Sequence, residues 1–519
     1  MNSRSIHAPK NHASPLTLHG RFRARIAAPV AAAARLQLGL WLGALSLIVG
    51  LGPLATRGSA AARPDVVIFL ADDLGQLDST PYGATWLRTL NMQRLAASGL
   101  TFTRAYVASP SCAASRAALL TGLMPARNGA EENHSKPHAA LKKWPAYFQE
   151  LGYEVVAFGK VSHYRHTGDY GFDHFANDSF HDHAGIPAAV ELLQRRAGAA
   201  PRKPLCLFVG SNWPHVPWPE KDLGYDPAKV PLPAGTVDTP ATREWWARYA
   251  AAVTKCDDDL GLVLDAVRAH LPANTLFLFS SDHGAQWPFA KWTLYEAGVA
   301  APLIVDWPGV VTRGNRTAAM VQWVDLLPTL LDAVGGKSPA DIDGRSFLPV
   351  LRGRAEQHRD RIFTTHANDR GVNVYPARAV RDERFKYIRN LHPEFAFTTH
   401  VDIVRGPSGA REFFATWETA AKTDPQAAAI LQRYHSRPAE ELYDLASDPH
   451  EQRNLAADAR HAARLATLRT DLDAWLQAQG DTQKVFAEPR LLSDPKRWGP
   501  GGEISGDTKQ APKKKSPKS

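Results

Sequence analysis

The chain of 519 residues is long enough to bury a large core, and hydrophobic residues make up 44% of it. Its net charge of +9 arises at the two ends, because residues 1–62 hold seven basic side chains, residues 509–519 hold five, and neither segment contains an acidic residue. The rest is slightly acidic and does not interleave aromatic residues with basic patches, which argues against a nucleic-acid partner.

Residues 1–60 have the features of an export signal. Several Arg precede an apolar run at 38–55, and Gly58 and Ala60 then have the small-residue spacing of a cleavage site. The run is just long enough for a membrane anchor, although Gly residues and Pro53 weaken it. We therefore predict an exported protein, periplasmic or secreted, with no stable membrane span after cleavage; a retained anchor is the alternative.

Apolar strand-like runs alternate with amphipathic segments after residue 62. Strands are expected at 65–75, 153–160, 204–213, 274–284 and 301–309, an extended segment at 102–109, and helices at 89–100, from Ser115 onward and at 251–267. This order predicts an α/β fold with a large, mainly parallel sheet sandwiched by helices. Ligands in such sheets gather at the carboxyl ends of the strands, so the polar residues there are expected to converge.

Two pairs of possible metal ligands stand at such strand ends. Asp72 and Asp73 end the first strand, and Asp282 and His283 end a later one. Three carboxylates around one point repel each other unless a cation lies among them, and oxygen ligands suit calcium or magnesium. A single Asp pair more commonly caps the next helix, so the second pair is what favours a metal site.

The three cysteines have different settings. Cys206 lies in a predicted strand and Cys256 in a predicted helix, so both are expected in the core, and a disulfide between them stays open. Cys112 lies among small and polar residues. A bare thiol in an oxidising compartment is a liability unless it is used or modified.

The C-terminal part predicts a smaller domain. Residues 362–369 are expected to form the last strand of the large sheet, residues 377–391 and 441–456 to form a smaller antiparallel sheet, and residues 462–479 to form a helix whose apolar stripe packs on the core. The predicted organisation is a signal segment at 1–60, a large domain at 63–375, a smaller α+β domain at 376–492 and a disordered basic tail at 493–519.

Six motifs occur in the order that is typical of one enzyme family: ADDLG at 71–75, CAASR at 112–116, GKVSH at 159–163, NWPHVPWP at 212–219, SDHG at 281–284 and KWTLYEAG at 291–298. Together they resemble the type I sulfatases of the alkaline-phosphatase-like superfamily, from Val66 to about Asn454. The resemblance implies an alkaline-phosphatase-like catalytic domain followed by a smaller C-terminal domain with an antiparallel sheet.

The resemblance also implies a chemical use for the unpaired thiol. In this family a separate formylglycine-generating enzyme, here a transient partner, oxidises the cysteine to formylglycine, and an oxygen of the hydrated aldehyde attacks the sulfur of the substrate. The implied metal is Ca²⁺ rather than Mg²⁺. Its implied ligands are Asp72, Asp73, the modified Cys112, Asp282 and His283.

The remaining catalytic roles come from the same resemblance. Arg116 is expected to neutralise the sulfate and hold the nucleophile, and Lys160 and Lys291 to bind the sulfate. His215 is expected to protonate the leaving group and His163 to remove a proton from the nucleophile. A lone Lys is usually solvated and a lone His is usually structural, but the agreement of six motifs outweighs that interpretation.

Three positions depart from the commonest family pattern. Ala114 stands where Pro is more frequent, and His163 follows Lys160 by three residues where many members have two. His283 stands where Asn is frequent, and imidazole is a less typical calcium ligand than oxygen.

The substrate prediction depends on weaker patterns. Residues 373–395 and 437–456 look most like the heparan N-sulfatases, which cleave the N-sulfo group of glucosamine, whereas GKVSH is similar to iduronate-type O-sulfatases. We predict N-sulfoglucosamine hydrolysis, with O-sulfatase action on a glycan as the alternative. Candidates for the substrate mouth, or else for hydrated surface loops, are His366, Asp369, Tyr375 and Arg378.

Three other functions stay open. A phosphoester or phosphonate hydrolase of the same superfamily would use the same formylglycine. An inactive carbohydrate-binding relative would keep the fold and lose the site, which the intact Cys112, Arg116 and Lys160 argue against. A cell-surface structural protein is suggested only by the export signal and the basic tail.

Overall fold

The computed structural model describes residues 63–176, 183–198, 202–406 and 409–505. The predicted signal segment at 1–60 lies outside these residues, as does the part of the predicted tail after residue 505. In the part that is described, no helix has the length and apolar character needed to span a membrane.

Within the described residues, the larger sheet has the strand order β5-β4-β6-β1-β7-β8-β2-β9. Neighbours are parallel except β8, which runs antiparallel to both β7 and β2. Every residue of β1 is buried, and its apolar run is unbroken because helices cover both faces of a central parallel strand. The bounds in sheet order are His174–Ala176, Glu154–Gly159, Leu205–Pro214, Val66–Asp72, Leu276–Ser281, Leu303–Asp306, Leu100–Phe102 and Asn315–Thr317.

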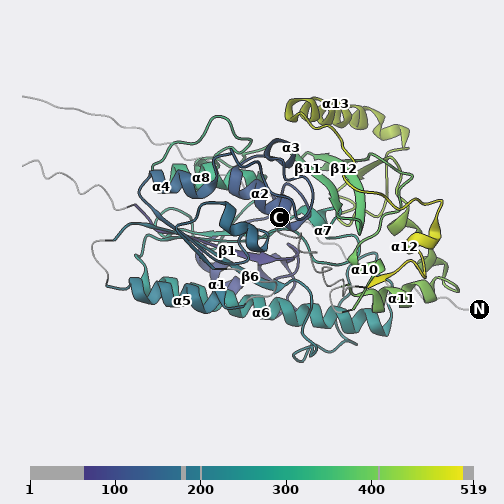
Figure 1. Ribbon diagram of the computed structural model, residues 1–519, viewed down its shortest axis with the longest axis horizontal. Coiled ribbons are helices and arrows are strands. Elements are labelled where there is room, and N and C mark those ends of the chain that lie inside the picture. Colours follow the sequence, from purple (N-terminus) through teal and green to yellow (C-terminus); the bar gives the residue numbers. More distant parts are fainter. Residues whose placement is uncertain (1–62, 177–182, 199–201, 407–408, 506–519) are drawn as a thin grey trace, which may run out of the picture. The chain divides into compact units, whose positions relative to one another are not determined.

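Helices cover both faces of this sheet, as predicted (Figure 1). One layer contains α1 (Leu90–Ser98), α5 (Gly185–Arg196) and the long α6 (Pro240–His270); the other contains α2 (Cys112–Thr121), α4 (Trp144–Glu150) and α8 (Leu326–Ala333). Cys206 in β6 and Cys256 in α6 are both buried, as expected of core residues, and neither forms a disulfide.

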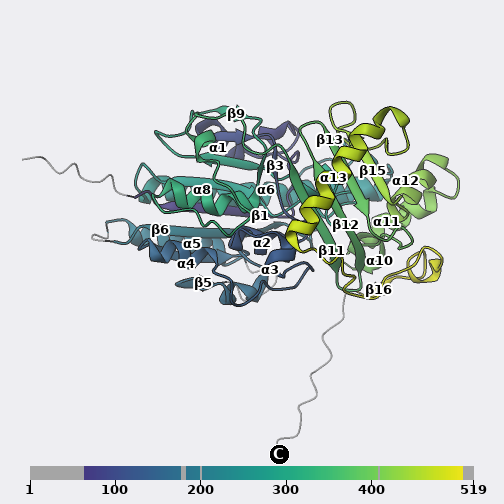
Figure 2. The same ribbon diagram turned by 90° about the horizontal axis from the view of Figure 1, so that it is seen from above.

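The smaller sheet is antiparallel, with strand order β11-β12-β13-β15. Alternate side chains face opposite sides: Ala379 and Ile388 join the core of the larger sheet, whereas Val380 and Tyr387 pack against α13 (Ala462–Gln479). Figure 2 shows α13 lying across this sheet. The strand bounds are Ile362–Asp369, Asn373–Arg381, Phe385–Asn390 and Glu440–Asp444, and the buried stripe of α13 is Leu465, Leu468, Leu472 and Leu476.

Shorter elements connect these layers. They are β3 (Ala105–Tyr106), α3 (Pro125–Asn128), α7 (Glu296–Val299), β10 (Val321–Gln322), α9 (Leu348–Leu351), α10 (His400–Ile403), β14 (Val404–Arg405), α11 (Arg411–Ala420), α12 (Pro425–His435) and β16 (Ile504–Ser505).

Two predictions about the C-terminal part are wrong. Residues 362–369 belong to the smaller sheet, because β11 pairs with β12 from Ile362 opposite Arg381 to Asp369 opposite Asn373. The predicted domain boundary after residue 375 consequently falls inside β12. Residues 493–505, expected in the disordered tail, are folded: β16 pairs with β14, and Glu503 lies 2.9 Å from Arg411.

The α13 stripe provides a test of how the smaller sheet is stabilised. Leu472 is fully buried between α13 and the sheet, so Leu472→Ala should lower the free energy of unfolding by about 2–5 kcal/mol through lost burial and a residual cavity. Leu262→Ala is the matched control, because that Leu is 58% exposed on α6. Urea unfolding followed by circular dichroism measures both, and equal effects would show that the stripe does not stabilise the fold.

Candidate catalytic and metal site

Adjacent strands of the larger sheet place the predicted site residues at one edge. Asp72 ends β1 and Asp73 follows it with a φ of 67°, a left-handed conformation that Asp adopts more readily than most residues. The Asp73 amide donates a hydrogen bond to Asp282 Oδ1 at 3.0 Å, which joins the end of β1 to the end of β7. The other residues that follow strands β4, β6 and β7 are Lys160, His215, Asp282 and His283.

Helix α2 places Cys112 at its first turn. The helix was expected to begin at Ser115, but it begins at Cys112, with extended Ser111 before it. The Ala113 amide, which has no acceptor within the helix, donates to Asn133 Oδ1 at 3.1 Å. Cys112 therefore lies where free amide groups and the helix dipole favour negative charge.

Four side chains form a compact group of possible metal ligands. One ligand atom each of Asp73, Cys112, Asp282 and His283 lies within 4.8 Å of the other three, and all four residues are buried. His283 Nδ1 lies 3.0 Å from the Gly284 carbonyl, so Nδ1 carries the hydrogen and Nε2 presents a lone pair to the group. Carboxylate oxygens with one imidazole acceptor form a donor set that suits a divalent cation.

Asp72 lies beside this group. Its Oδ1 is 3.9 Å from Cys112 Sγ, and its carboxylate pairs with Lys160 and, at 3.2 Å, with Arg116. Burial raises the pKa of Asp72 to about 7, and the attraction of Lys160 offsets that only in part. A cation bound nearby would favour the ionised carboxylate.

Three buried cations balance the three carboxylates. Arg116 Nε donates to Asp282 Oδ2 at 2.9 Å, and Lys291 Nζ contacts both oxygens of Asp73 at 2.9 and 2.7 Å. Lys160 Nζ pairs with Asp72 and lies 3.7 Å from Cys112 Sγ. The side chains are at most 2% exposed, so the six groups form a nearly dry cluster that has no net charge when all of them are ionised.

The Cys112 thiol is not prepared to act as a thiolate nucleophile. Burial raises its pKa far above the usual value, although Lys160 and Lys291 oppose the shift. The thiol is therefore protonated and forms no disulfide, at the first turn of a helix in which Ser115 and Arg116 follow it.

The two predicted proton-transfer histidines occupy different positions. His215 Nε2 lies 3.8 Å from Asp73 Oδ2, and its Nδ1 lies 2.6 Å from the Val216 carbonyl. His163 is buried, and its Nε2 lies 2.6 Å from Nδ1 of His134. His134 was not predicted from the sequence, because its loop has no periodic pattern and its partner is 29 residues away.

The four candidates for the substrate mouth are buried in or next to β11 and β12, and none is a hydrated surface residue. His366 bonds to Asn373, Arg378 bonds to Asp481, and the Tyr375 ring packs against Phe397. Asp369 contacts loops of the larger domain through Asn133, His134 and Trp292, and Arg378 lies 3.7 Å from Glu131 in the same region.

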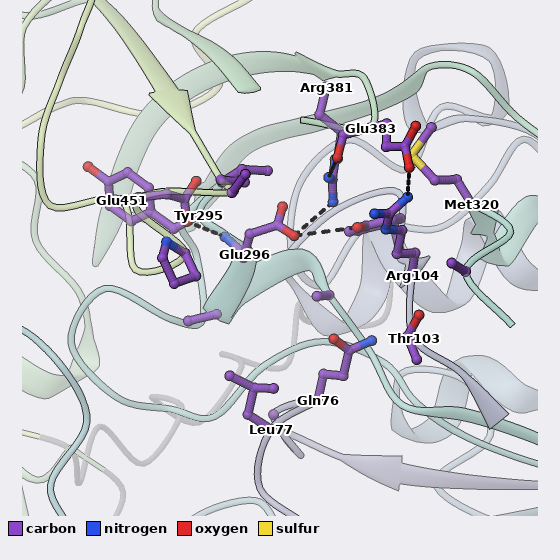
Figure 3. Close-up of a pocket in the computed structure, with 18 of the residues that line it drawn as sticks. Gln76, Leu77, Thr103, Arg104, Tyr295, Glu296, Met320, Arg381, Glu383 and Glu451 are labelled. Carbon is purple, nitrogen blue, oxygen red and sulfur yellow. Dashed lines mark hydrogen bonds and ion pairs between the residues drawn. The ribbon is translucent and has the colours of Figure 1, made fainter. Parts of the chain in front are cut away.

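A cavity of about 1730 Å³ is a separate feature, because none of the predicted catalytic or metal residues lines it. Figure 3 shows ion pairs among the residues that line it. Arg104 lies 2.7 Å from Glu383, and Arg381 lies 2.8 Å from Glu296. We therefore place the chemistry at the buried charge cluster.

Two family profiles match this chain. A profile of the sulfatase family matches residues 64–336, and one for the C-terminal region of N-sulphoglucosamine sulphohydrolase matches residues 283–421. An ulvan-active sulfatase from Formosa agariphila is 31% identical, over 82% of this chain and 83% of that protein. The N-sulphoglucosamine sulphohydrolase of Homo sapiens is 30% identical, over 81% of this chain and 92% of that protein.

Solved structures show the fold. One structure, in complex with its substrate D-glucosamine-2-N,6-O-disulfate, has a TM-score of 0.60 at 20% identity and covers 81% of this chain and 99% of its own. The phosphonate monoester hydrolase of Silicibacter pomeroyi has a TM-score of 0.61 at 19% identity and covers 81% and 96%. The fold thus accommodates two chemistries, but the sequence profile and the relatives agree: this chain belongs to the sulfatase family and is a sulfuric ester hydrolase.

Proposed function

We propose that this chain is an exported, formylglycine-dependent sulfatase that removes sulfate from a sulfated glycan, with N-sulfoglucosamine as its substrate. The observation that carries the proposal is the position of Cys112, at the first turn of α2 and within 3.9 Å of Asp72, Asp73 and Lys160 of the charge cluster. Such a cluster can hold a cation and a sulfo group side by side in a nearly dry site.

The surroundings of Cys112 suit formylglycine, because the residue is unpaired, 1% exposed and adjacent to the cluster of metal ligands. The modified residue would supply a hydrated aldehyde as an oxygen nucleophile, in place of a buried thiol that stays protonated. Asp73, Asp282 and His283, with Asp72 beside them, would hold Ca²⁺ near it.

The other side chains have roles that follow from their charge and position. Lys160 and Lys291 bind the sulfo oxygens, and Arg116 keeps Asp72 and Asp282 oriented. His215 gives a proton to the leaving atom from Nε2, which requires the imidazolium form, because Nδ1 keeps its hydrogen for the Val216 carbonyl. His163 accepts a proton from the nucleophile.

The substrate proposal is supported by the C-terminal half. The profile match over residues 283–421 and the human relative, matched over 92% of its length, both have the name N-sulphoglucosamine sulphohydrolase. Relatives named ulvan-active sulfatase and Δ4,5-hexuronate-2-O-sulfatase, at 31% and 27% identity, support glycan O-sulfatase action as the second candidate.

Modification of Cys112 can be tested by intact-peptide mass. The Cys112 peptide from the native host should be lighter by about 18 Da than the thiol form, because oxygen replaces sulfur and two hydrogens are lost. The peptide with buried Cys206 is the internal control and should keep the thiol mass. Cys112→Ala should abolish turnover; full activity of the protein with an unmodified thiol would contradict the proposal.

Metal dependence has a separate test. The native protein should contain about one divalent ion per chain, and Asp282→Asn should lose the ion together with sulfate release, by roughly 10²-fold or more. Elemental analysis and sulfate assays measure the two effects. Asp265→Asn, at a 60% exposed side chain on α6, is the matched control. A fully active native protein without a divalent ion would refute the metal assignment.

Substrate choice is decided by parallel assays. We expect sulfate release from N-sulfoglucosamine at a higher kcat/KM than from glucosamine 6-sulfate or a 2-sulfated uronic acid disaccharide, because an amine and a hydroxyl leaving group need differently placed proton donors. Release only from the O-sulfated sugars would eliminate the N-sulfatase proposal. Faster turnover of an aryl phosphonate than of an aryl sulfate would instead identify a phosphonate hydrolase.

A further inference from the structure

Asp369, the last residue of β11, is the centre of a buried hydrogen-bond network. Its Oδ1 lies 3.1 Å from His134 Nε2, and its Oδ2 accepts hydrogen bonds from Asn133 Nδ2 at 2.9 Å and Trp292 Nε1 at 3.1 Å. His134 then contacts His163, with its Nδ1 2.6 Å from His163 Nε2. A carboxylate of the smaller sheet is therefore linked through one imidazole to the proposed proton acceptor.

The chemistry of these groups fixes where the hydrogens lie. Burial would raise the pKa of Asp369, but the hydrogen bond from His134 and the nearby His400 hold it well below its usual range, so the carboxylate is ionised and can only accept. His134 must then carry its hydrogen on Nε2. When His134 is uncharged, its bare Nδ1 accepts the hydrogen of His163 Nε2.

In this arrangement Nδ1 of His163 makes no hydrogen bond to the other residues of the network. Burial and the neighbouring His134 lower the pKa of His163 well below its usual value, so this imidazole is neutral and its Nδ1 has a lone pair. Among the residues that the structure describes, His163 Nδ1 is buried and has no hydrogen-bond partner. A buried, unpaired acceptor is costly to keep and is found where a proton or a ligand is to be received.

We infer that Asp369 and His134 are positioning residues that hold His163 in the tautomer with hydrogen on Nε2, so that Nδ1 is its proton-accepting atom. The inference rests on the role of His163 in the proposed function. It replaces the expectation that Asp369 contacts substrate, because Asp369 is 2% exposed and both of its oxygens already accept protein hydrogen bonds.

Asn133 gives Asp369 a second link to the site. Its side-chain oxygen accepts the hydrogen bond from the Ala113 amide, and its nitrogen donates to Asp369. The same carboxylate thus orients the group that holds the first turn of α2, next to Cys112, and the imidazole that orients His163.

The substitution Asp369→Asn tests this directly. The new amide oxygen is needed at the Oδ2 position, where Asn133 and Trp292 both donate, so the NH₂ group must face His134 Nε2. His134 would then accept there, carry its hydrogen on Nδ1 and donate to His163 Nε2. His163 Nδ1 would become a donor, so the variant reverses the tautomer while keeping the shape of the side chain.

Nitrogen NMR of the full chain labelled with ¹⁵N-histidine reads the tautomer without relying on turnover. At about pH 8, where imidazole is ordinarily neutral, His163 should show an unprotonated Nδ1 and a protonated Nε2 in the native chain and the reverse in Asp369→Asn. The matched control is Asp382→Asn, a buried carboxylate of the β12–β13 turn whose Oδ1 accepts backbone hydrogen bonds and whose Oδ2 pairs with Arg464 at 3.2 Å, and it should leave His163 unchanged.

Kinetics supply the second readout. Asp369→Asn should lower kcat roughly 10²- to 10³-fold, the range for losing a positioned base, with a much smaller change in KM. If that variant does not fold, His134→Gln and His134→Leu replace it: Gln can donate to Asp369 and accept from His163 and should restore most of the activity that Leu loses. An unchanged His163 tautomer in Asp369→Asn, or equal activity of the Gln and Leu variants, would overturn the inference.

Failure of the proposed function would look different. In that case no sulfated sugar would be hydrolysed by the native chain, while the NMR spectrum would still show hydrogen on His163 Nε2 and the reversal in Asp369→Asn.

Discussion

Mutual neutralisation of buried charges is the constraint on which the site depends. Moving one isolated ion into a protein interior costs several kcal/mol, and removing one partner of a buried pair typically costs about 3–5 kcal/mol. Each carboxylate here has a cation in contact, and each cation contacts at least one carboxylate. The residues concerned are Asp72, Asp73, Asp282, Arg116, Lys160 and Lys291. Separating the ends of β1, β4 and β7 from the first turn of α2 would therefore leave buried charges without their partners.

The same balance determines what the cluster can attract. With three charges of each sign it is neutral, so a divalent cation would leave an excess of positive charge in a nearly dry site, where an anionic sulfo group is strongly favoured. The large cavity in Figure 3 has ion pairs in its lining, such as Arg104 with Glu383 and Arg381 with Glu296, and none of the six residues of the cluster lines it.

Sequence patterns predicted the parts of this site that have local signals. Buried runs ending in acids identified the strand ends, and the helix at 462–479 was correct to the residue. Two errors were made although the sequence held a signal against them. The start of α2 was expected at Ser115, but Ser111 is a capping-type residue immediately before the helix. Residues 362–369 were separated from β12, but the Asn368–Gly371 segment between the two strands is rich in turn residues. An apolar run with a polar end looks the same in either sheet, so β11 was assigned to the wrong one. His134 had no signal of any kind, because its role arises from contacts 29 and 235 residues away.

The smaller sheet is joined to the chemistry by a continuous path of contacts. Arg378 in β12 pairs with Asp481, just after α13, at 2.9 Å, and donates to the His366 carbonyl in β11 at 2.8 Å. Three residues further along β11, Asp369 contacts Asn133, His134 and Trp292. Asn133 accepts a hydrogen bond from the Ala113 amide, His134 contacts His163, and Trp292 directly follows Lys291 in the sequence. Because α13 holds the sheet and the sheet holds Asp369, the packing of the C-terminal helix sets the orientation of groups beside Cys112. A division of this chain into a catalytic and an accessory domain therefore does not describe how the site is built, and β11 belongs to both.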